Sequence, residues 1–303
     1  MIYLGIDTSC YTTSLAAVDE DGVVVADRRI PLEVEPGKKG LRQSHMVFQH
    51  IKNLAQIAES FPGKVAAVAA SAAPRPAEDS YMPVFAVSES AGKLMAASAG
   101  AKFYSLTHQH GHIGAALLDK PEIPEGEMLG LHLSGGTTEL LRIVVRRGII
   151  HEIETIGGTK DISCGQLLDR TANHLGLPFP GGPELEKIAT VPEPMRVSVR
   201  GMRCNLSGAE TALKKLRISG MPDGVVAATA QEVVRNTVLE LIANAKHITG
   251  IRRVLLFGGV VRNMYLRKSL KRDPDIIFAE KQYASDNACG LADQAAKLFK
   301  AGL

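Results

Sequence analysis

His108 and His112 are the residues whose type and spacing point most directly to chemistry, because they stand four positions apart at the start of an expected helix, residues 108–118. Side chains four apart share one face of a helix, and two imidazoles on one face suit zinc or another transition metal. His110 would face elsewhere. A third, acidic ligand must come from another part of the chain, and Asp286 is the candidate. Spacing alone leaves a metal site and an ordinary polar helix start both open.

The residue after the first histidine argues against one kind of metal chemistry. Gln109 occupies the place at which the HExxH motif of zinc proteases carries the glutamate that acts as general base. A metalloprotease is therefore poorly supported.

A second kind of chemistry is indicated by a pattern that occurs twice. Leu4-Gly-Ile-Asp-Thr-Ser-Cys-Tyr-Thr-Thr-Ser-Leu15 matches Leu129-Gly-Leu-His-Leu-Ser-Gly-Gly-Thr-Thr-Glu-Leu140 at a constant offset, 129 − 4 = 125. Each copy predicts an apolar strand, a turn of small or hydroxyl residues and a second apolar strand.

The turn of the second copy has the composition of an anion-binding loop. Gly135 and Gly136 let the backbone approach a ligand and adopt positive φ. Successive N–H groups, together with the hydroxyls of Ser134 and Thr137, can then hold phosphate oxygens. Two such hairpins, one at the start of each half, predict a duplicated fold that holds phosphates between two lobes; a pair of ordinary tight hairpins is the alternative.

Three further segments could line a nucleotide site. An expected strand–Gly-Gly–helix junction ends at Asn263, which can bond a sugar or a base edge while the nucleotide lies at the helix N-terminus. Asp161 and Asp169 flank an expected helix start, where they either face a ligand or cap the helix. The tight loop Pro180–Pro183 follows, with Glu186 just beyond it.

The remaining pattern is that of an α/β chain with mixed sheets. The expected segments are helices at 44–60, 89–97, 108–118, 165–175, 225–249, 261–270 and 285–298, and strands at 65–70, 103–106 and 253–257. We expect two lobes: residues 1–115, to which residues 285–303 return, and residues 116–284.

Composition bounds the class of protein. The 303-residue chain is 45% apolar, as globular proteins are, and none of its apolar runs approaches the roughly 20 residues that span a bilayer. The N-terminus lacks the features of a signal peptide, so we expect a soluble, cytoplasmic protein without membrane contact. Cys10, Cys164, Cys204 and Cys289 form no CxxC pair, which disfavours a zinc ribbon or a disulfide framework. Local basic clusters such as Lys214-Lys215-Arg217 are either solvated helix faces or phosphate contacts.

In their order along the chain, these motifs resemble the TsaD family, once called O-sialoglycoprotein endopeptidases (Gcp or YgjD). The most specific element is Leu175-Gly-Leu-Pro-Phe-Pro-Gly-Gly-Pro183, and the resemblance covers nearly the whole chain, including residues 205–211, 258–263 and 285–288. It implies an actin/Hsp70-like (ASKHA) α/β fold, in which two lobes each hold a mixed sheet flanked by helices and a nucleotide lies in the cleft between them.

The resemblance also implies a function. Family members transfer the threonylcarbamoyl group from threonylcarbamoyl-AMP to the exocyclic amine of the adenosine beside the anticodon of certain tRNAs. Bacterial members work with TsaB-like and TsaE-like proteins; whether this chain also forms a homodimer stays open. By position, His108, His112 and Asp286 would hold one iron or zinc ion. The adenylate or ATP ligand would be held by Leu133, Ser134, Gly135, Gly136, Thr137, Asp169, Gly182, Glu186 and Asn263.

The chain departs from the family pattern at several positions. Tyr11 and Thr12 replace an acidic pair, Thr137 replaces a histidine or asparagine, and Glu210 replaces a lysine. Residues 73–79 replace a glycine-rich loop. The binding scaffold is kept while the acids expected for acyl transfer are not, so no catalytic residue is assigned. The alternative function is that of a divergent paralogue: a nucleotide- and metal-binding partner subunit, or a carbamoyl or acyl transferase with another acceptor.

Overall fold

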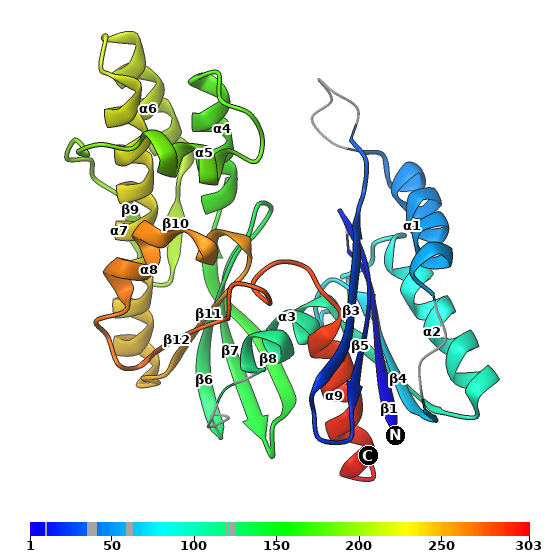
Figure 1. Ribbon diagram of the computed structural model, residues 1–303. Helices are drawn as coiled ribbons and strands as arrows, with labels where there is room; N and C mark the ends of the chain where they lie inside the picture. Colours follow the sequence, from blue (N-terminus) through cyan, green and yellow to red (C-terminus); the bar gives the residue numbers. More distant parts are fainter. Residues whose placement is uncertain (10, 35–40, 59–62, 119, 121–124) are drawn as a thin grey trace. The chain divides into compact units, whose positions relative to one another are not determined.

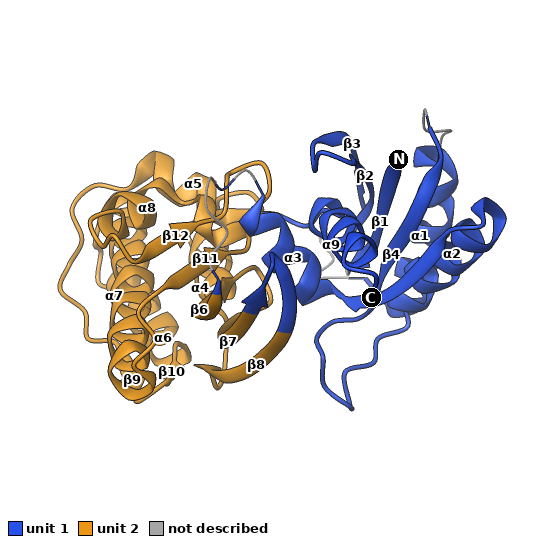
Figure 2. Ribbon diagram, turned by 90° about the horizontal axis from the view of Figure 1, so that it is seen from below, with its two compact units in different colours: residues 1–125, 145–151, 285–303 blue, residues 126–144, 152–284 orange. Residues whose placement is uncertain are grey.

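A computed structural model describes residues 1–9, 11–34, 41–58, 63–118, 120 and 125–303, which form two compact units (Figure 2). Unit 1 comprises residues 1–125, 145–151 and 285–303, and unit 2 comprises residues 126–144 and 152–284. Cys10 and the last two residues of the first expected helix lie outside the described part of the chain. None of the described helices combines the length and apolar character needed to cross a membrane.

The sheet of unit 1 has five strands in the order β3-β2-β1-β4-β5 (Figure 1). Antiparallel pairing joins β1 to β2 and β2 to β3, whereas β1–β4 and β4–β5 are parallel, so the sheet is mixed as expected. β1 and β4 are buried along most of their length because helices cover both faces. The strands are β1 (Ile2–Ser9), β2 (Thr12–Asp19), β3 (Val24–Pro31), β4 (Val65–Ala73) and β5 (Lys102–Thr107).

Four helices flank this sheet: α1 (Gln43–Ile57), α2 (Phe85–Ala99), α3 (His108–Leu117) and α9 (Cys289–Lys300). α3 and α9 approach so closely that a Cβ atom on Gly290 would lie 2.0 Å from the carbonyl oxygen of Gly111. Only glycine fits there, and this contact brings the segment before α9 beside α3. α9 begins at Cys289, four residues later than expected, because the Asn287 amide bonds to the backbone of Ser285 and Cys289 and holds a turn.

The sheet of unit 2 has seven strands in the order β12-β11-β6-β7-β8-β10-β9. Its segment β8-β7-β6-β11-β12 repeats the order β3-β2-β1-β4-β5, and the two repeated sequence patterns supply β1–β2 in one unit and β6–β7 in the other. The duplication predicted from the sequence is therefore present in the topology. The strands are β6 (Gly126–Leu133), β7 (Thr138–Arg146), β8 (Ile149–Thr159), β9 (Ser198–Arg200), β10 (Arg203–Asn205), β11 (Val254–Phe257) and β12 (Ile276–Phe278).

The helices of unit 2 are α4 (Cys164–His174), α5 (Gly181–Ile188), α6 (Ser207–Ile218), α7 (Asp223–Thr249) and α8 (Met264–Leu270). α7 supplies much of the buried core through a run of small and aliphatic residues. The helix expected from residue 261 starts only at Met264, because Gly259–Arg262 form a 3-10 turn and Asn263 caps α8 by accepting a hydrogen bond from Leu266 N.

Candidate functional site

The start of α3 determines which histidines face which way. Thr107 caps the helix: its Oγ1 accepts a hydrogen bond from His110 N, and His110 Nδ1 lies 2.7 Å from the same oxygen. His110 is thereby engaged in the cap. His108 and His112, one turn apart, share another face of the helix, with their ring centroids 4.4 Å apart.

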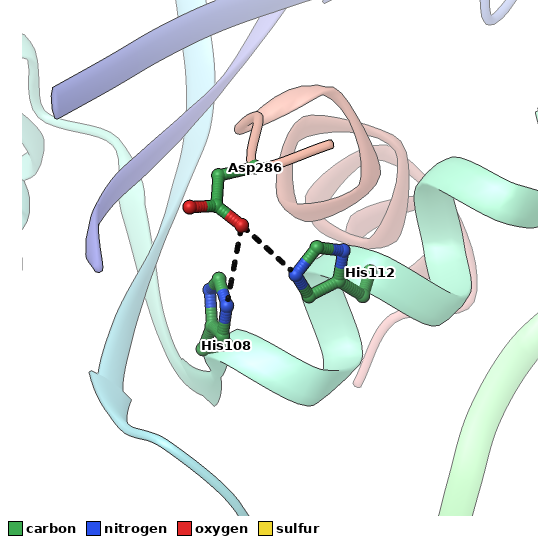
Figure 3. Close-up of side chains that lie close together, drawn as sticks. All are labelled: His108, His112 and Asp286. Atoms are coloured by element: carbon green, nitrogen blue, oxygen red, sulfur yellow. Dashed lines mark ion pairs between the residues drawn. The ribbon is translucent and has the colours of Figure 1, made fainter. Parts of the chain in front are cut away.

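The carboxylate of Asp286, in the segment before α9, lies beside that face of α3 (Figure 3). Asp286 Oδ1 lies 3.3 Å from His112 Nε2 and 3.9 Å from His108 Nε2. Ligand atoms of all three side chains lie within 4.8 Å of one another. The structure therefore brings together, within unit 1, the three residues that the sequence nominated as metal ligands.

A fourth residue, Asp7 at the end of β1, orients this group. His108 Nδ1 lies 3.0 Å from Asp7 Oδ1, and the Asp7 side chain is almost wholly buried. Burial on its own would raise the pKa of Asp7, but the charge and hydrogen bond of His108 lower it overall. Burial opposes protonation of His108, whereas Asp7 and then Asp286 raise its pKa to about 9. Asp7 is not a ligand candidate from its sequence context, where its place as an acid inside the repeated strand pattern is the only signal.

This arrangement fits a divalent metal. A carboxylate on Nδ1 fixes the ring of a metal-binding histidine and leaves Nε2 for the ion, which is the geometry of His108. Two imidazole nitrogens and one carboxylate oxygen form a donor set that zinc and iron accept with positions left open. The chemistry of the three donors, their convergence and the support of His108 by Asp7 all fit a metal site.

The candidate phosphate loop of unit 2 has a defined backbone. Ser134 N donates to the carbonyl oxygen of Thr137 at 2.9 Å, and Thr137 N donates to Ser134 Oγ at 3.0 Å. Gly135 and Gly136 are exposed, and a Cβ atom on either would meet nothing within 4 Å. A ligand can therefore approach this backbone, whereas the side chain of Leu133 is in the core and leaves only its backbone for such a contact.

α4 holds this loop in place. Ser163 Oγ donates to the carbonyl oxygen of Gly135 at 2.8 Å. A Cβ atom on Gly165 would lie 2.4 Å from the carbonyl oxygen of Ser134, so the first turn of α4 contacts the loop backbone to backbone. Asp161 has a different task, because its carboxylate accepts from Leu206 N and Ser207 N and caps α6. Burial opposes its charge, but a hydrogen bond with the Ser207 side chain and those from nearby backbone N–H groups lower the pKa of Asp161 to about 2.

Asp169 connects α4 to the next candidate segment. Its Oδ1 accepts a hydrogen bond from Gly181 N at 2.8 Å, at the start of α5. Burial raises the pKa of Asp169 although this bond opposes the shift. Gly182, the next residue, has open space where a Cβ atom would stand. The loop at residues 134–137, Asp169 and Gly182 are thus joined through α4.

Glu186 and Asn263 belong to a second group at the start of α8. Glu186 Oε1 accepts from Met264 N at 2.6 Å, while the Asn263 amide caps α8 and donates to Gln231 Oε1 at 2.9 Å. A cavity of about 320 Å³ opens beside them. It is lined by Glu186, Ala189, Thr190, Pro192, Ala228, Gln231, Met264, Tyr265 and Lys268. The sequence did not indicate Gln231, because this residue lies within the long helix α7 and no motif there predicts its hydrogen bond with Asn263.

The sequence profile described as TsaD, tRNA N6-adenosine threonylcarbamoyltransferase, matches residues 50–292. The chain belongs to this family.

The sequences of relatives in the family align with nearly the whole of this chain. It is 30% identical to a tRNA N6-adenosine threonylcarbamoyltransferase of Thermus thermophilus, over 96% of this chain and 91% of that protein. It is 26% identical to the "Probable bifunctional tRNA threonylcarbamoyladenosine biosynthesis protein" of Thermoplasma volcanium, and spans 57% of that protein's length. Both relatives are thus named for the modification of tRNA.

Two solved structures with other names share the fold. The chain superposes on full-length HypF with a TM-score of 0.62 at 13% identity, covering 98% of this chain and 55% of HypF. Component A of the Acidaminococcus fermentans (R)-2-hydroxyglutaryl-CoA dehydratase gives a TM-score of 0.58 at 18% identity, with both chains fully covered. These likenesses confirm the actin/Hsp70-like fold predicted from the sequence.

Proposed function

We propose that this chain transfers the threonylcarbamoyl group of threonylcarbamoyl-AMP to the exocyclic amine of an adenosine beside the anticodon of tRNA. The observation that carries the proposal is the convergence of His108, His112 and Asp286 in a chain of the TsaD family. Membership gives the reaction class. A relative kept only for its fold would have no need for this convergent, Asp7-supported ligand set.

The proposed reaction is an acyl transfer. The amine nitrogen of the acceptor bonds to the carbamoyl carbon, the bond from that carbon to the phosphate oxygen breaks, AMP leaves and the amine loses a proton. In this proposal the backbone of residues 134–137 binds the phosphate of the donor, and Asp169, Gly182, Glu186 and Asn263 hold its nucleoside. Fixed N–H donors are suited to an anion because they need no reorganisation when it binds.

A divalent metal held by His108, His112 and Asp286 would supply a Lewis acid that polarises a carbonyl group or neutralises phosphate charge. Asp7 contributes by holding the His108 ring through Nδ1. Iron and zinc are both compatible with this donor set.

The test is a reconstitution. The purified chain is combined with TsaB-like and TsaE-like proteins, which we propose as its partners, and with threonylcarbamoyl-AMP and tRNA that lacks the modification. Mass spectrometry of the digested nucleosides is expected to detect threonylcarbamoyladenosine. The Thermus thermophilus relative serves as positive control; modification by the relative but not by this chain would overturn the proposal.

One observation favours a second candidate, a paralogue that binds nucleotide and metal but acts as a partner subunit or on another acceptor. Tyr11 is an exposed aromatic residue at the position where the family carries an acid. In that case the chain binds metal and nucleotide without modifying tRNA. Gain of tRNA modification in the double variant Tyr11→Asp with Thr12→Glu would support this candidate, whereas activity of the unaltered chain would exclude it.

A further inference from the structure

β9 and β10, at one end of the unit 2 sheet, form an antiparallel hairpin with two different faces (Figure 1). Cys204 belongs to the core beside α7, and Val199, directly opposite it in the pairing, packs against the same core. Side chains alternate along a strand, so the neighbours of these two residues face the other way. The neighbours are all exposed: Ser198, Arg200, Arg203 and Asn205.

Two arginines on this exposed face are direct cross-strand neighbours. The register pairs Arg200 with Arg203, and Ser198 with Asn205. Like charges directly opposite each other destabilise a pair of strands. Neither arginine side chain forms a hydrogen bond or an ion pair with any residue that the structure describes. The protein therefore leaves these two charges uncompensated.

A third arginine extends the same surface. Arg196, also exposed and without a partner among the described residues, lines a cavity of about 290 Å³ together with Ser198 and Asn205. Gly208, in the first turn of α6, lines this cavity too and has open space where a Cβ atom would stand. The Cα atoms of Arg196 and Arg200 can be up to about 14 Å apart. We call this row of three cations, Arg196, Arg200 and Arg203, the arginine face.

Charged residues on an edge strand have a simpler use, because they prevent pairing with a strand of another chain. β9 is such an edge. That use requires neither three unpaired cations nor two that oppose each other. The acid closest to the hairpin in the hydrogen-bond network, Asp161, does not neutralise them, because its carboxylate accepts from Leu206 N and Ser207 N. The arginine face therefore has more charge than protection of an edge explains.

A row of unpaired arginines suits a chain of phosphates. The guanidinium group binds phosphate oxygens through two parallel hydrogen bonds. Serine and asparagine side chains, which Ser198 and Asn205 supply beside the arginines, also contact the backbone of nucleic acids. A single small anion could not occupy the whole row, whereas a polyanion could.

The hairpin is connected to the loop that we assign to the phosphate of the donor. Lys160 N donates a hydrogen bond to the carbonyl oxygen of Cys204 at 2.9 Å. Three residues further along the chain, Ser163 Oγ donates to the carbonyl oxygen of Gly135. One short segment thus contacts both the hairpin and the loop, so an acceptor bound to the arginine face would lie on the same unit as the donor.

We propose that the arginine face binds consecutive phosphates in the backbone of the RNA acceptor. The inference rests on the proposed function, because it assumes that RNA is the acceptor. It adds to that function a surface that positions the acceptor by its backbone without reading its bases.

The test measures binding of a fluorescently labelled, unmodified tRNA transcript to the full-length chain at a series of salt concentrations. Arg196→Gln, Arg200→Gln and Arg203→Gln should each weaken binding by about ten-fold at low salt and lower the slope of log affinity against log salt by about one. Arg272→Gln is the matched control. Arg272 is likewise exposed and without a described partner, but it precedes β12 at the opposite end of the sheet, so its variant should bind normally.

Arg200→Glu separates a binding role from a structural one. A carboxylate at this position would face Arg203 and replace repulsion by attraction. The Tm should therefore stay the same or rise, while tRNA affinity falls further than in Arg200→Gln. If both Arg200 variants lose Tm together with affinity, the arginine supports the fold and the inference is wrong.

The outcomes keep this inference distinct from the proposed function. A chain that modifies tRNA, but whose arginine-face variants bind tRNA normally, overturns the inference and leaves the function standing. Loss of tRNA binding in these variants of a chain that modifies no tRNA supports the arginine face and counts against the function. Variants that bind tRNA normally but no longer bind a TsaB-like or TsaE-like protein overturn the inference in favour of a protein contact.

Discussion

Asp7 and His108 are 101 residues apart in the sequence, yet His108 Nδ1 lies 3.0 Å from the Asp7 carboxylate. The contact links the first repeated strand, β1, to the first turn of α3. Because the carboxylate occupies Nδ1, the ring presents Nε2 toward Asp286 and His112. One buried acid thus determines which nitrogen of His108 is available to a ligand.

Asp7→Asn should therefore lower metal affinity while leaving all three proposed ligands in place. Loss of a supporting carboxylate typically costs about 10- to 100-fold in affinity. Isothermal titration of the metal-free protein with zinc would measure the change. His110→Ala is the matched control on the same helix: it keeps the Thr107 cap on the backbone, loses only the imidazole contact with Thr107, and should cost about 1 kcal/mol of stability or less while leaving metal affinity unchanged.

His108→Ala should remove the bound metal and leave the protein folded, because His108 is the first residue of α3, is partly exposed and lies outside the hydrophobic clusters of unit 1. Elemental analysis of the purified variant, together with its circular dichroism spectrum, checks both parts of the expectation. Unchanged metal content in a folded variant would remove His108 from the ligand set.

Two glycines of unit 2 give opposite predictions. Gly136→Ala should leave stability within about 0.5 kcal/mol, since the added methyl group enters open space. It should nevertheless weaken adenylate binding by about ten-fold or more, because the methyl group occupies the face that a phosphate would approach.

Gly165→Ala should instead destabilise the protein by about 1–3 kcal/mol, since the methyl group would be 2.4 Å from the carbonyl oxygen of Ser134. Thermal unfolding and titration with a fluorescent adenine nucleotide separate the two variants. Normal nucleotide binding by Gly136→Ala would show that the ligand does not approach this loop.

His50 makes the stability of unit 1 depend on pH. The side chain is fully buried on α1, with Nδ1 2.8 Å from Thr13 Oγ1, and burial lowers its pKa from 6.5 to about 4, although Asp7 opposes the shift. Between these values the unfolded chain binds a proton that the folded chain does not, so stability is complete above pH 6.5 and falls as pH decreases toward 4. The contribution is at most about 3 kcal/mol.

Chemical denaturation at a series of pH values checks this, with His50→Gln as the comparison. The variant should show a flatter dependence between pH 6.5 and 4, whatever its absolute stability. Parallel curves for the two proteins would contradict the assignment.

Much of the fold was predictable because it is encoded in local patterns. The offset repeat at residues 4–15 and 129–140 predicted two equivalent hairpins, and both sheets repeat the same strand order. Hydrogen bonds between side chains and nearby backbone groups explain why two helix starts were predicted too early. Asn263 and Asn287 bond to nearby backbone groups, so the helices after them begin later than apolar periodicity suggested.

The sequence by itself determined which residues could be ligands, since a histidine pair at helical spacing suits a metal and a Ser-Gly-Gly-Thr turn suits an anion, but it left an ordinary helix start and a plain hairpin equally open. Only the tertiary structure decided which of them cooperate. Asp286 meets His112 because Gly290 and Gly111 let α9 approach α3, and Asp7 meets His108 because β1 ends beside the start of α3. Asp161, equally plausible in sequence, is committed to the cap of α6. Hydrogen bonds and metal contacts require separations of a few ångströms, and residues far apart in the chain reach them only through packing.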